Sequence, residues 1–166
     1  NIAGLAAVAG WRVLLVDFDP QGNAGHILGY KWRGESDDGQ HLVDTLIKRG
    51  QLTPSLTAVR PNLDVVAGGG ALDTLEDVLA GMIARGGDIQ SVFADALSQL
   101  ATDYDLVVVD TPPTRPLLLR LALSATRWII VPTRPGRTSI EGLRALATEI
   151  GAARKTNTEL ELLGAL

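Results

Sequence analysis

Two short runs of consecutive hydrophobic residues stand out along the chain. They span Val13 to Val16 and Leu106 to Val109. Neither run alternates with polar residues, so each predicts a strand that is covered on both faces. Hydrophobic positions between the runs recur at helical spacing, and strands that alternate with helices are typical of a parallel sheet. The pattern therefore predicts an α/β fold in which a doubly wound, mostly parallel sheet is flanked by helices.

Turn residues divide the rest of the first hundred residues. Helices are expected over 1–9 and 42–47, and a strand over 63–67, with a polar loop over 29–40 between the two helices. The strand ends at Gly68-Gly69-Gly70, which predicts a turn and not a phosphate-binding loop because no Lys-Ser or Lys-Thr follows.

Three acid or hydroxyl positions carry helix-start signals. Asp73 is expected to cap a helix that ends at Gly86-Gly87, and Asp88 to start the next one. Thr138 and Glu141 match a capping box ahead of a helix with Ile140, Leu143, Leu146 and Ile150 on one face.

Composition limits the class of protein. With 166 residues, 46% hydrophobic and 20% charged, the chain fits one globular domain over 1–166. It contains no cysteine, which excludes disulfides, thiolate zinc sites and iron–sulfur ligation in this segment. No apolar run approaches the roughly 18 residues that span a bilayer, so we expect no membrane partner and a cytoplasmic location. A net charge of -4 argues against a strongly basic nucleic-acid surface, although not against a local basic face.

Acids follow both buried runs. Asp17 and Asp19 come after the first and Asp110 after the second, and each run leads into a turn that contains proline. Ligands of parallel sheets bind beyond the carboxyl ends of the strands, which is where these acids are expected to lie. They predict a phosphate and metal site. The alternative is that each acid merely ends its strand at the surface.

The motif Val-Asp-x-Asp-Pro-Gln-Gly-Asn at residues 16–23, followed by Val-Val-Asp-x-Pro-Pro at 108–113, resembles the ParA (Soj) group of partition ATPases, which are deviant Walker P-loop NTPases. The resemblance extends through the apolar segment 122–132 and Ile140-Glu-Gly-Leu143. It implies ATP and Mg²⁺ as cofactors. It also implies an ATP-bound homodimer, nonspecific binding to DNA, association with the nucleoid and a ParB-type partner.

The resemblance assigns roles to the motif residues. Asp19 would orient or deprotonate the attacking water, Asp110 would reach magnesium through a water, and Asp17 would lie in the outer shell of the metal. The other positions expected to contact nucleotide or to act as a switch are Pro20, Gln21, Gly22, Asn23, Thr111, Pro112 and Pro113. From the residues themselves, Asn23 is equally compatible with a helix cap.

One family feature does not occur in the sequence. The Gly-rich loop with two lysines and a Lys-Thr pair would end shortly before Asn1, and no such loop is present in the 166 residues. Because that loop holds the phosphates, we expect the chain to be a fragment of a longer protein and inactive alone. A natural remnant without the loop is the alternative.

Basic residues are densest between Arg115 and Arg137. A solvated face is their default explanation, but Arg134 and Arg137 are candidates for phosphate contacts with DNA. His26 and His41 have no paired acid or metal-ligand spacing, so neither is expected to be catalytic. The leading prediction is a partitioning ATPase for plasmid or chromosome DNA. A MinD-like positioning ATPase and a non-catalytic scaffold are the alternatives.

Overall fold

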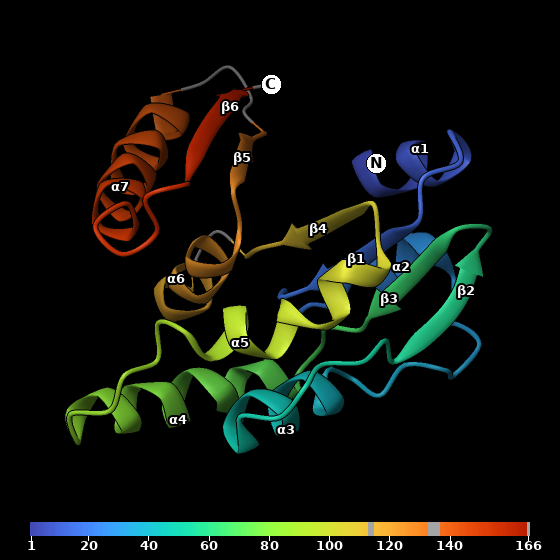
Figure 1. The fold of residues 1–166 in the computed structure, drawn as a ribbon, viewed down its shortest axis with the longest axis horizontal. Coiled ribbons are helices and arrows are strands. Elements are labelled where there is room, and N and C mark those ends of the chain that lie inside the picture. Colours follow the sequence, from blue (N-terminus) through green and yellow to red (C-terminus); the bar gives the residue numbers. More distant parts are fainter. Residues whose placement is uncertain (113–114, 133–136, 166) are drawn as a thin grey trace.

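The computed structural model describes residues 1–112, 115–132 and 137–165 (Figure 1). Its main sheet has the strand order β2-β3-β1-β4, and its strands are β1 (Val13–Asp17), β2 (Leu56–Arg60), β3 (Leu63–Val66) and β4 (Leu106–Asp110). β1 lies between β3 and β4 and pairs in parallel with both. Only β2 runs antiparallel to its neighbour. The predicted α/β fold with a mostly parallel sheet is confirmed.

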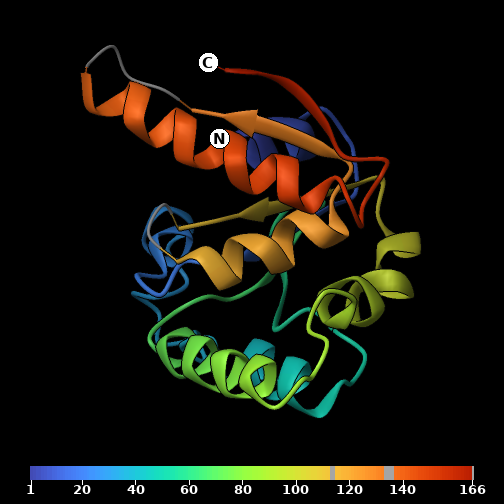
Figure 2. The same cartoon turned by 90° about the vertical axis from the view of Figure 1, so that its left-hand side faces the viewer.

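Helices cover both faces of this sheet, as Figures 1 and 2 show. One face carries α3 (Gln40–Lys48), α4 (Ala71–Ala84), α5 (Val92–Ser98) and α6 (Pro116–Ala125). The other carries α1 (Ile2–Val8) and α2 (Asn23–Leu28). Because side chains alternate along β1, Leu14 and Val16 pack on the first face while Val13 and Leu15 pack on the second. Burial on both faces explains why the run is not interrupted by polar residues.

A second, two-stranded sheet pairs β5 (Trp128–Val131) with β6 (Glu161–Ala165) in parallel. It packs with α7 (Arg137–Ala153) around Leu123, Ile129, Ile150 and Leu160. Helix α6 joins the two units, since Leu118 and Leu121 belong to the first core and Leu119 and Leu123 to the other. Within the described ranges no strand pairs with the outer edge of β4.

Two of the three predicted helix starts were wrong. Helix α4 begins at Ala71, whose N–H donates to the Asp38 carbonyl at 3.1 Å, so the loop before it supplies the cap and Asp73 lies in the first turn. Asp88 accepts a hydrogen bond from Gln90 N at 2.8 Å and forms a turn, and α5 starts only at Val92. The helix expected after Thr138 is present as α7, which begins at Arg137, but the side chains of the predicted capping box, Thr138 and Glu141, lie outside the described part of the structure.

Strand β2 and the short 3₁₀ helix η1 (Leu100–Asp103) were not predicted. Strand β2 lies at the edge of the sheet, and of its residues only Val59 is buried. Its sequence, Leu-Thr-Ala-Val-Arg, therefore shows no alternation that would indicate a strand. The polar loop expected over residues 29–40 is confirmed, apart from Gln40, which is the first residue of α3.

Candidate functional site

The carboxyl ends of β1 and β4 bring two of the predicted site residues side by side. Asp17 and Asp110 are partners in the parallel register, and the N–H of Phe18 donates to the carbonyl oxygen of Asp110 at 2.8 Å. Paired residues of a parallel sheet point to the same face, here the face covered by α1. The carboxyl ends of the two strands therefore meet at one edge of the sheet.

Asp17 is completely buried. Its Oδ1 accepts a hydrogen bond from the N–H of Asp19 at 2.9 Å, whereas Oδ2 has no partner among the described residues. Burial raises the pKa of Asp17 to about 6, and the charges of Asp110 and Asp19 add to the shift. A buried acid with one unsatisfied oxygen is costly for the fold and is typical of a site that acts on a ligand.

Gly68 provides the space in which Asp17 lies. A Cβ atom at this position would be 2.5 Å from the carbonyl oxygen of Asp17 and 2.9 Å from that of Asp19. Only glycine therefore fits between β3 and the acidic loop. The three-glycine run is a turn, as predicted, and it also sets how closely the loop after β1 approaches α4.

Asp19 organises the loop that bears it. Its Oδ1 accepts from the N–H of Gln21 at 2.9 Å, and its Oδ2 accepts from the side-chain amide of Asn23 at 3.2 Å. Gly22, at φ 59°, is the N-cap residue of α2, so the interpretation of Asn23 as a helix cap was wrong. The amide of Asn23 instead holds the carboxylate of Asp19. Asp19 is partly exposed, and its carboxylate accepts these hydrogen bonds from its own short loop.

The remaining predicted positions are distributed around these acids. Pro20 is partly buried and Gln21 is exposed; Thr111 is partly buried and Pro112 is buried, directly after Asp110. Pro113 and Arg134 lie outside the described residues, and Arg137 is the first residue of α7.

The acids carry uncompensated negative charge. Desolvation raises the pKa of Asp110, and the charge of Asp19 raises it further. In the described part of the chain, no Lys or Arg forms an ion pair with Asp17, Asp19 or Asp110. Nor do three acid or histidine side chains come together there as direct metal ligands. This arrangement fits a hydrated cation, which these carboxylates would contact through its water molecules.

Lys31 is a neighbour of the site that sequence reasoning missed. Its Nζ lies 3.4 Å from the carbonyl oxygen of Gln21 and 3.9 Å from Asp38 Oδ1. Asp38 itself has a φ of 57°, an unfavourable conformation for a residue with a side chain. In the sequence, the pair Asp38-Gly39 indicates a turn, but it does not indicate that this turn and Lys31 lie beside the loop of Asp19.

Two of the arginines in the basic stretch are paired with acids. Arg115 contacts Asp73 and Glu76, and Arg120 Nε lies 2.9 Å from Glu149 Oε2. The guanidinium of Arg127 lies 4.6 Å above the ring of Trp128. The stretch is therefore not a uniform basic face.

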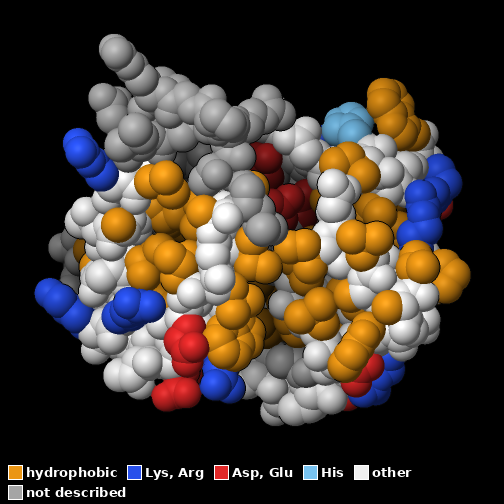
Figure 3. Space-filling view, turned by 90° about the horizontal axis from the view of Figure 1, so that it is seen from above, with side chains coloured by type: hydrophobic (Ala, Val, Ile, Leu, Met, Phe, Trp, Pro, Cys, Tyr) orange, Lys and Arg blue, Asp and Glu red, His pale blue; other side chains and the backbone are white. Residues whose placement is uncertain are grey.

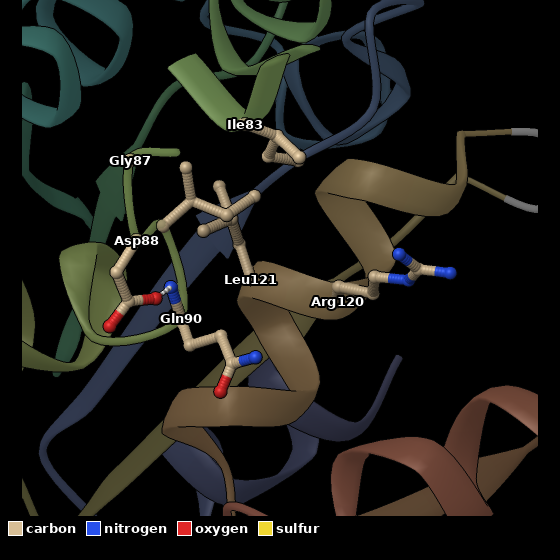
Figure 4. A pocket seen from close by; sticks show the side chains of 7 residues that line it. Ile83, Gly87, Asp88, Gln90, Arg120 and Leu121 are labelled. Atoms are coloured by element: carbon tan, nitrogen blue, oxygen red, sulfur yellow. Dashed lines mark hydrogen bonds between the residues drawn. The ribbon is translucent and has the colours of Figure 1, made fainter. Parts of the chain in front are cut away.

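A small cavity of about 210 Å³ lies between the end of α4 and α6 (Figure 4). The side chains around it include those of Ile83, Gln90, Arg120 and Leu121. None of the acids at the carboxyl edge of the sheet lines it, so it is separate from the candidate site. In the described ranges, no helix has the length and hydropathy needed to cross a membrane.

The chain is similar in sequence to a known family of proteins. A family model described as an AAA domain matches residues 1–162. The sporulation initiation inhibitor protein Soj of Bacillus subtilis is 32% identical over 168 residues, covering all of this chain and 64% of Soj. The chromosome partitioning protein ParA of Myxococcus xanthus is 32% identical over all of this chain and 57% of its own length. The cell division protein PomZ of the same organism is 35% identical over 84% of this chain and 42% of PomZ.

Solved structures agree with the fold. The cobyrinic acid a,c-diamide synthase of Mycobacterium smegmatis, with a bound ATP analogue and magnesium, superposes with a TM-score of 0.82 at 27% identity, over 99% of this chain and 65% of that one. A plasmid partition protein of Borrelia burgdorferi gives a TM-score of 0.76 at 20% identity, over 98% of this chain and 68% of that one. The chain thus spans between 42% and 64% of the length of the curated relatives named above.

Proposed function

This chain belongs to the ParA/MinD superfamily of P-loop ATPases, and we propose that the protein from which it comes is an ATP-dependent DNA-partitioning ATPase. The observation that carries the proposal is the meeting of Asp17 and Asp110 at the carboxyl edge of the sheet, with Asp19 two residues beyond Asp17. Relatives named for chromosome partitioning support it.

In this proposal the three acids have different tasks. Asp19, which is partly exposed, orients or accepts a proton from the attacking water, and the amide of Asn23 keeps its carboxylate in place. Asp110 and Asp17 would hold a hydrated Mg²⁺ through its water molecules. When bound, Mg²⁺ neutralises charge on the phosphate oxygens as the terminal phosphate is transferred to water. Thr111 and Pro112 follow Asp110 and would report whether that phosphate is present.

The wider cycle follows from what ATP must do. ATP stabilises a homodimer that binds DNA nonspecifically, and a ParB-type partner stimulates hydrolysis and so releases the DNA. A ligand shifts an equilibrium only through its different affinities for the two states, so the dimer must bind ATP more tightly than the monomer does. The protein would then be found in the cytoplasm, associated with the nucleoid.

The test uses the full-length protein with Asp19→Ala. Turnover should be abolished while ATP affinity is kept, because a group that positions water acts on the transition state more than on the ground state. Phosphate release measures the first quantity, and equilibrium binding of a fluorescent ATP analogue measures the second. Asp44→Ala is the control, since Asp44 lies on α3 and pairs only with exposed neighbours, Lys48 and Gln40.

Loss of nucleotide binding with an unchanged rate at saturation would assign Asp19 to binding instead of catalysis. A wild-type protein that binds neither ATP nor DNA would favour the alternative of a non-catalytic scaffold.

DNA contact is tested at Arg134 and Arg137. If both meet phosphates, replacing both with alanine should weaken ATP-dependent DNA binding equally on unrelated sequences and lower the salt slope by about one to two units in log-log form. ATP hydrolysis without DNA should change little. An unchanged slope with normal dimerisation would place both residues on a solvated face.

A positioning ATPase of the MinD type is the second candidate. The similarity to PomZ, which is named for cell division, favours keeping it. A MinD-like protein would bind lipid vesicles through a terminal amphipathic helix, whereas a partitioning ATPase would bind DNA and leave vesicles unoccupied. Cosedimentation of the ATP-bound protein with anionic vesicles, compared with DNA binding in the same buffer, separates the two.

A further inference from the structure

Arg115 anchors the far end of the segment that begins at Asp110. It is the residue before α6, which starts at Pro116, and its guanidinium contacts two carboxylates of α4. Arg115 Nη1 donates to Glu76 Oε2 at 2.9 Å, and Nη2 donates to Asp73 Oδ1. Beside this pair, the N–H of Leu117 lies 3.4 Å from Glu76 Oε1. The start of α6 is thus tied to the first turns of α4 by side-chain and backbone donors.

These contacts have more structural effect than ordinary surface ion pairs. The side chain of Glu76 is only 16% exposed and that of Arg115 is 36% exposed, so solvent screens the pair incompletely. A guanidinium that uses two nitrogens on two carboxylates has little freedom to rotate. The position of Arg115 relative to α4 is therefore fixed.

The residues that precede α4 contact the loop that bears Asp17 and Asp19. Helix α4 follows Gly68-Gly69-Gly70, and the backbone at Gly68 lies directly against Asp17 and Asp19. The start of α4 is consequently connected to both acid-bearing segments. Gly68, just before the helix, contacts the segment that follows β1, and Arg115, which pairs with the helix, ends the segment that follows β4. Neither contact belongs to the two sequence motifs that indicated the site.

We propose that Arg115 is a positioning residue of the ATPase site, which couples the segment after Asp110 to the loop of Asp19 through the first turns of α4. The inference rests on the proposed function, since it concerns the geometry in which that site hydrolyses ATP. Arg115 holds one end of the segment that begins at Asp110 while β4 holds the other. Its loss would free that end without removing any group that faces the nucleotide.

The chain offers a matched control on the same helix. Arg120 lies five positions after Arg115, and its Nε forms an ion pair with Glu149 of α7 at 2.9 Å. Removing either arginine deletes one guanidinium from a contact between helices, with two ion pairs to α4 lost at Arg115 and one ion pair to α7 lost at Arg120. Only Arg115 is connected to the acid-bearing segments, so a purely stabilising role predicts equal effects of the two substitutions on the rate of hydrolysis.

The experiment measures steady-state ATP hydrolysis by the full-length protein as wild type, Arg115→Met, Arg115→Lys and Arg120→Met, with thermal unfolding of each. We expect Arg115→Met to lower kcat at least roughly tenfold with KM for ATP within about twofold, because small displacements of a catalytic group have large effects on rate. Arg120→Met should keep the wild-type kcat. Arg115→Lys should recover part of kcat, since it restores the charge but not the two-pronged geometry.

Each outcome decides a different question. If wild type hydrolyses ATP and Arg115→Met has the same kcat, or if Arg120→Met loses as much, the positioning role is wrong while the proposed function stands. If wild type itself does not hydrolyse ATP, the proposed function fails first. Should Arg115→Met not fold, Glu76→Gln removes the buried half of the pair, and a normal kcat in that variant overturns the inference.

Discussion

At the scale of single residues, Asp17 has the most unusual environment. It is fully buried at the end of a strand whose other side chains are hydrophobic, and its pKa of about 6 lies well above the ordinary value of 3.8. A raised pKa means that folding favours the protonated acid. Its contribution to stability is therefore complete below pH 3.8 and is lost as the pH rises through 6. At neutral pH the ionised Asp17 lowers the free energy of unfolding, and it places a carboxylate beside Asp110.

Asp17→Asn should consequently stabilise the metal-free protein at pH 7.5. The shift corresponds to at most about 3 kcal/mol, because one pKa unit equals about 1.4 kcal/mol. Asparagine also keeps an oxygen that accepts the N–H of Asp19. Urea unfolding in EDTA at pH 4 and pH 7.5 measures the effect, which should disappear at the lower pH.

Asp105→Asn serves as a control of opposite sign. Hydrogen bonds from Arg12 lower the pKa of Asp105, so its contribution is present at neutral pH and is lost as the pH falls. This variant should be slightly less stable than wild type at pH 7.5. Equal effects of the two substitutions would show that the burial of Asp17 does not govern its ionisation.

At the scale of secondary-structure elements, α5 supports the acidic loop from the opposite face. Phe18 lies between the two acids of the motif, and its ring meets that of Phe93 edge to face, with centroids 4.7 Å apart. Both rings are fully buried. Because side chains alternate, anchoring Phe18 on one face of the sheet directs its neighbour Asp17 to the other.

Phe93→Leu tests this support. It should lower the free energy of unfolding by roughly 1–2 kcal/mol, through lost packing and the lost aromatic contact. It should also reduce kcat of the full-length protein, because the backbone between Asp17 and Asp19 is less firmly held. Leu79→Val, in the same hydrophobic cluster on α4, is the control. If it destabilises the protein equally and reduces kcat as much, the support is not specific to α5.

The sequence was informative wherever local signals and tertiary structure agree. The runs at β1 and β4 and the acids after them were predicted because a buried strand leaves an uninterrupted apolar pattern. The start of α4 could not be predicted, since its cap is a carbonyl from Asp38, more than thirty residues earlier than Ala71 in the chain. The start of α5 was misplaced because Asp88 forms a turn ahead of the helix. The link from Arg115 to α4 also depends on contacts between distant segments, which residue spacing does not encode.

At the scale of the whole molecule, the two sheets remain separate. Helix α6 leads from β4 to β5, yet these strands are not paired, and both keep an edge without a strand partner in the described part of the chain. Figure 3 shows hydrophobic side chains across this side of the molecule, with acidic side chains deeper in a hollow. Large hydrophobic residues with exposed side chains occur in α1, at Leu5 and Val8, and in β5, at Trp128 and Ile130. Surfaces of this kind mark contacts with further protein.

The 166-residue chain alone should not hydrolyse ATP, because it contains no Gly-rich loop whose backbone could hold the phosphates. Phosphate release should equal that of a sample without protein, and a version that includes residues before Asn1 with such a loop should be active. Release by the short chain that disappears on Asp19→Ala would contradict this expectation.

The parallel pairing of β1 with β4 also determines when the main sheet can be completed during synthesis of the chain. Asp17 and Asp110 are register partners separated by 93 positions. At about 5–20 residues per second, a ribosome needs on the order of 5–20 seconds to make that interval. Throughout that time the edge of β1 that pairs with β4 has no strand partner, and its free backbone groups can pair with other nascent chains. We therefore expect translation speed and chaperone supply, more than final stability, to determine the yield of soluble protein.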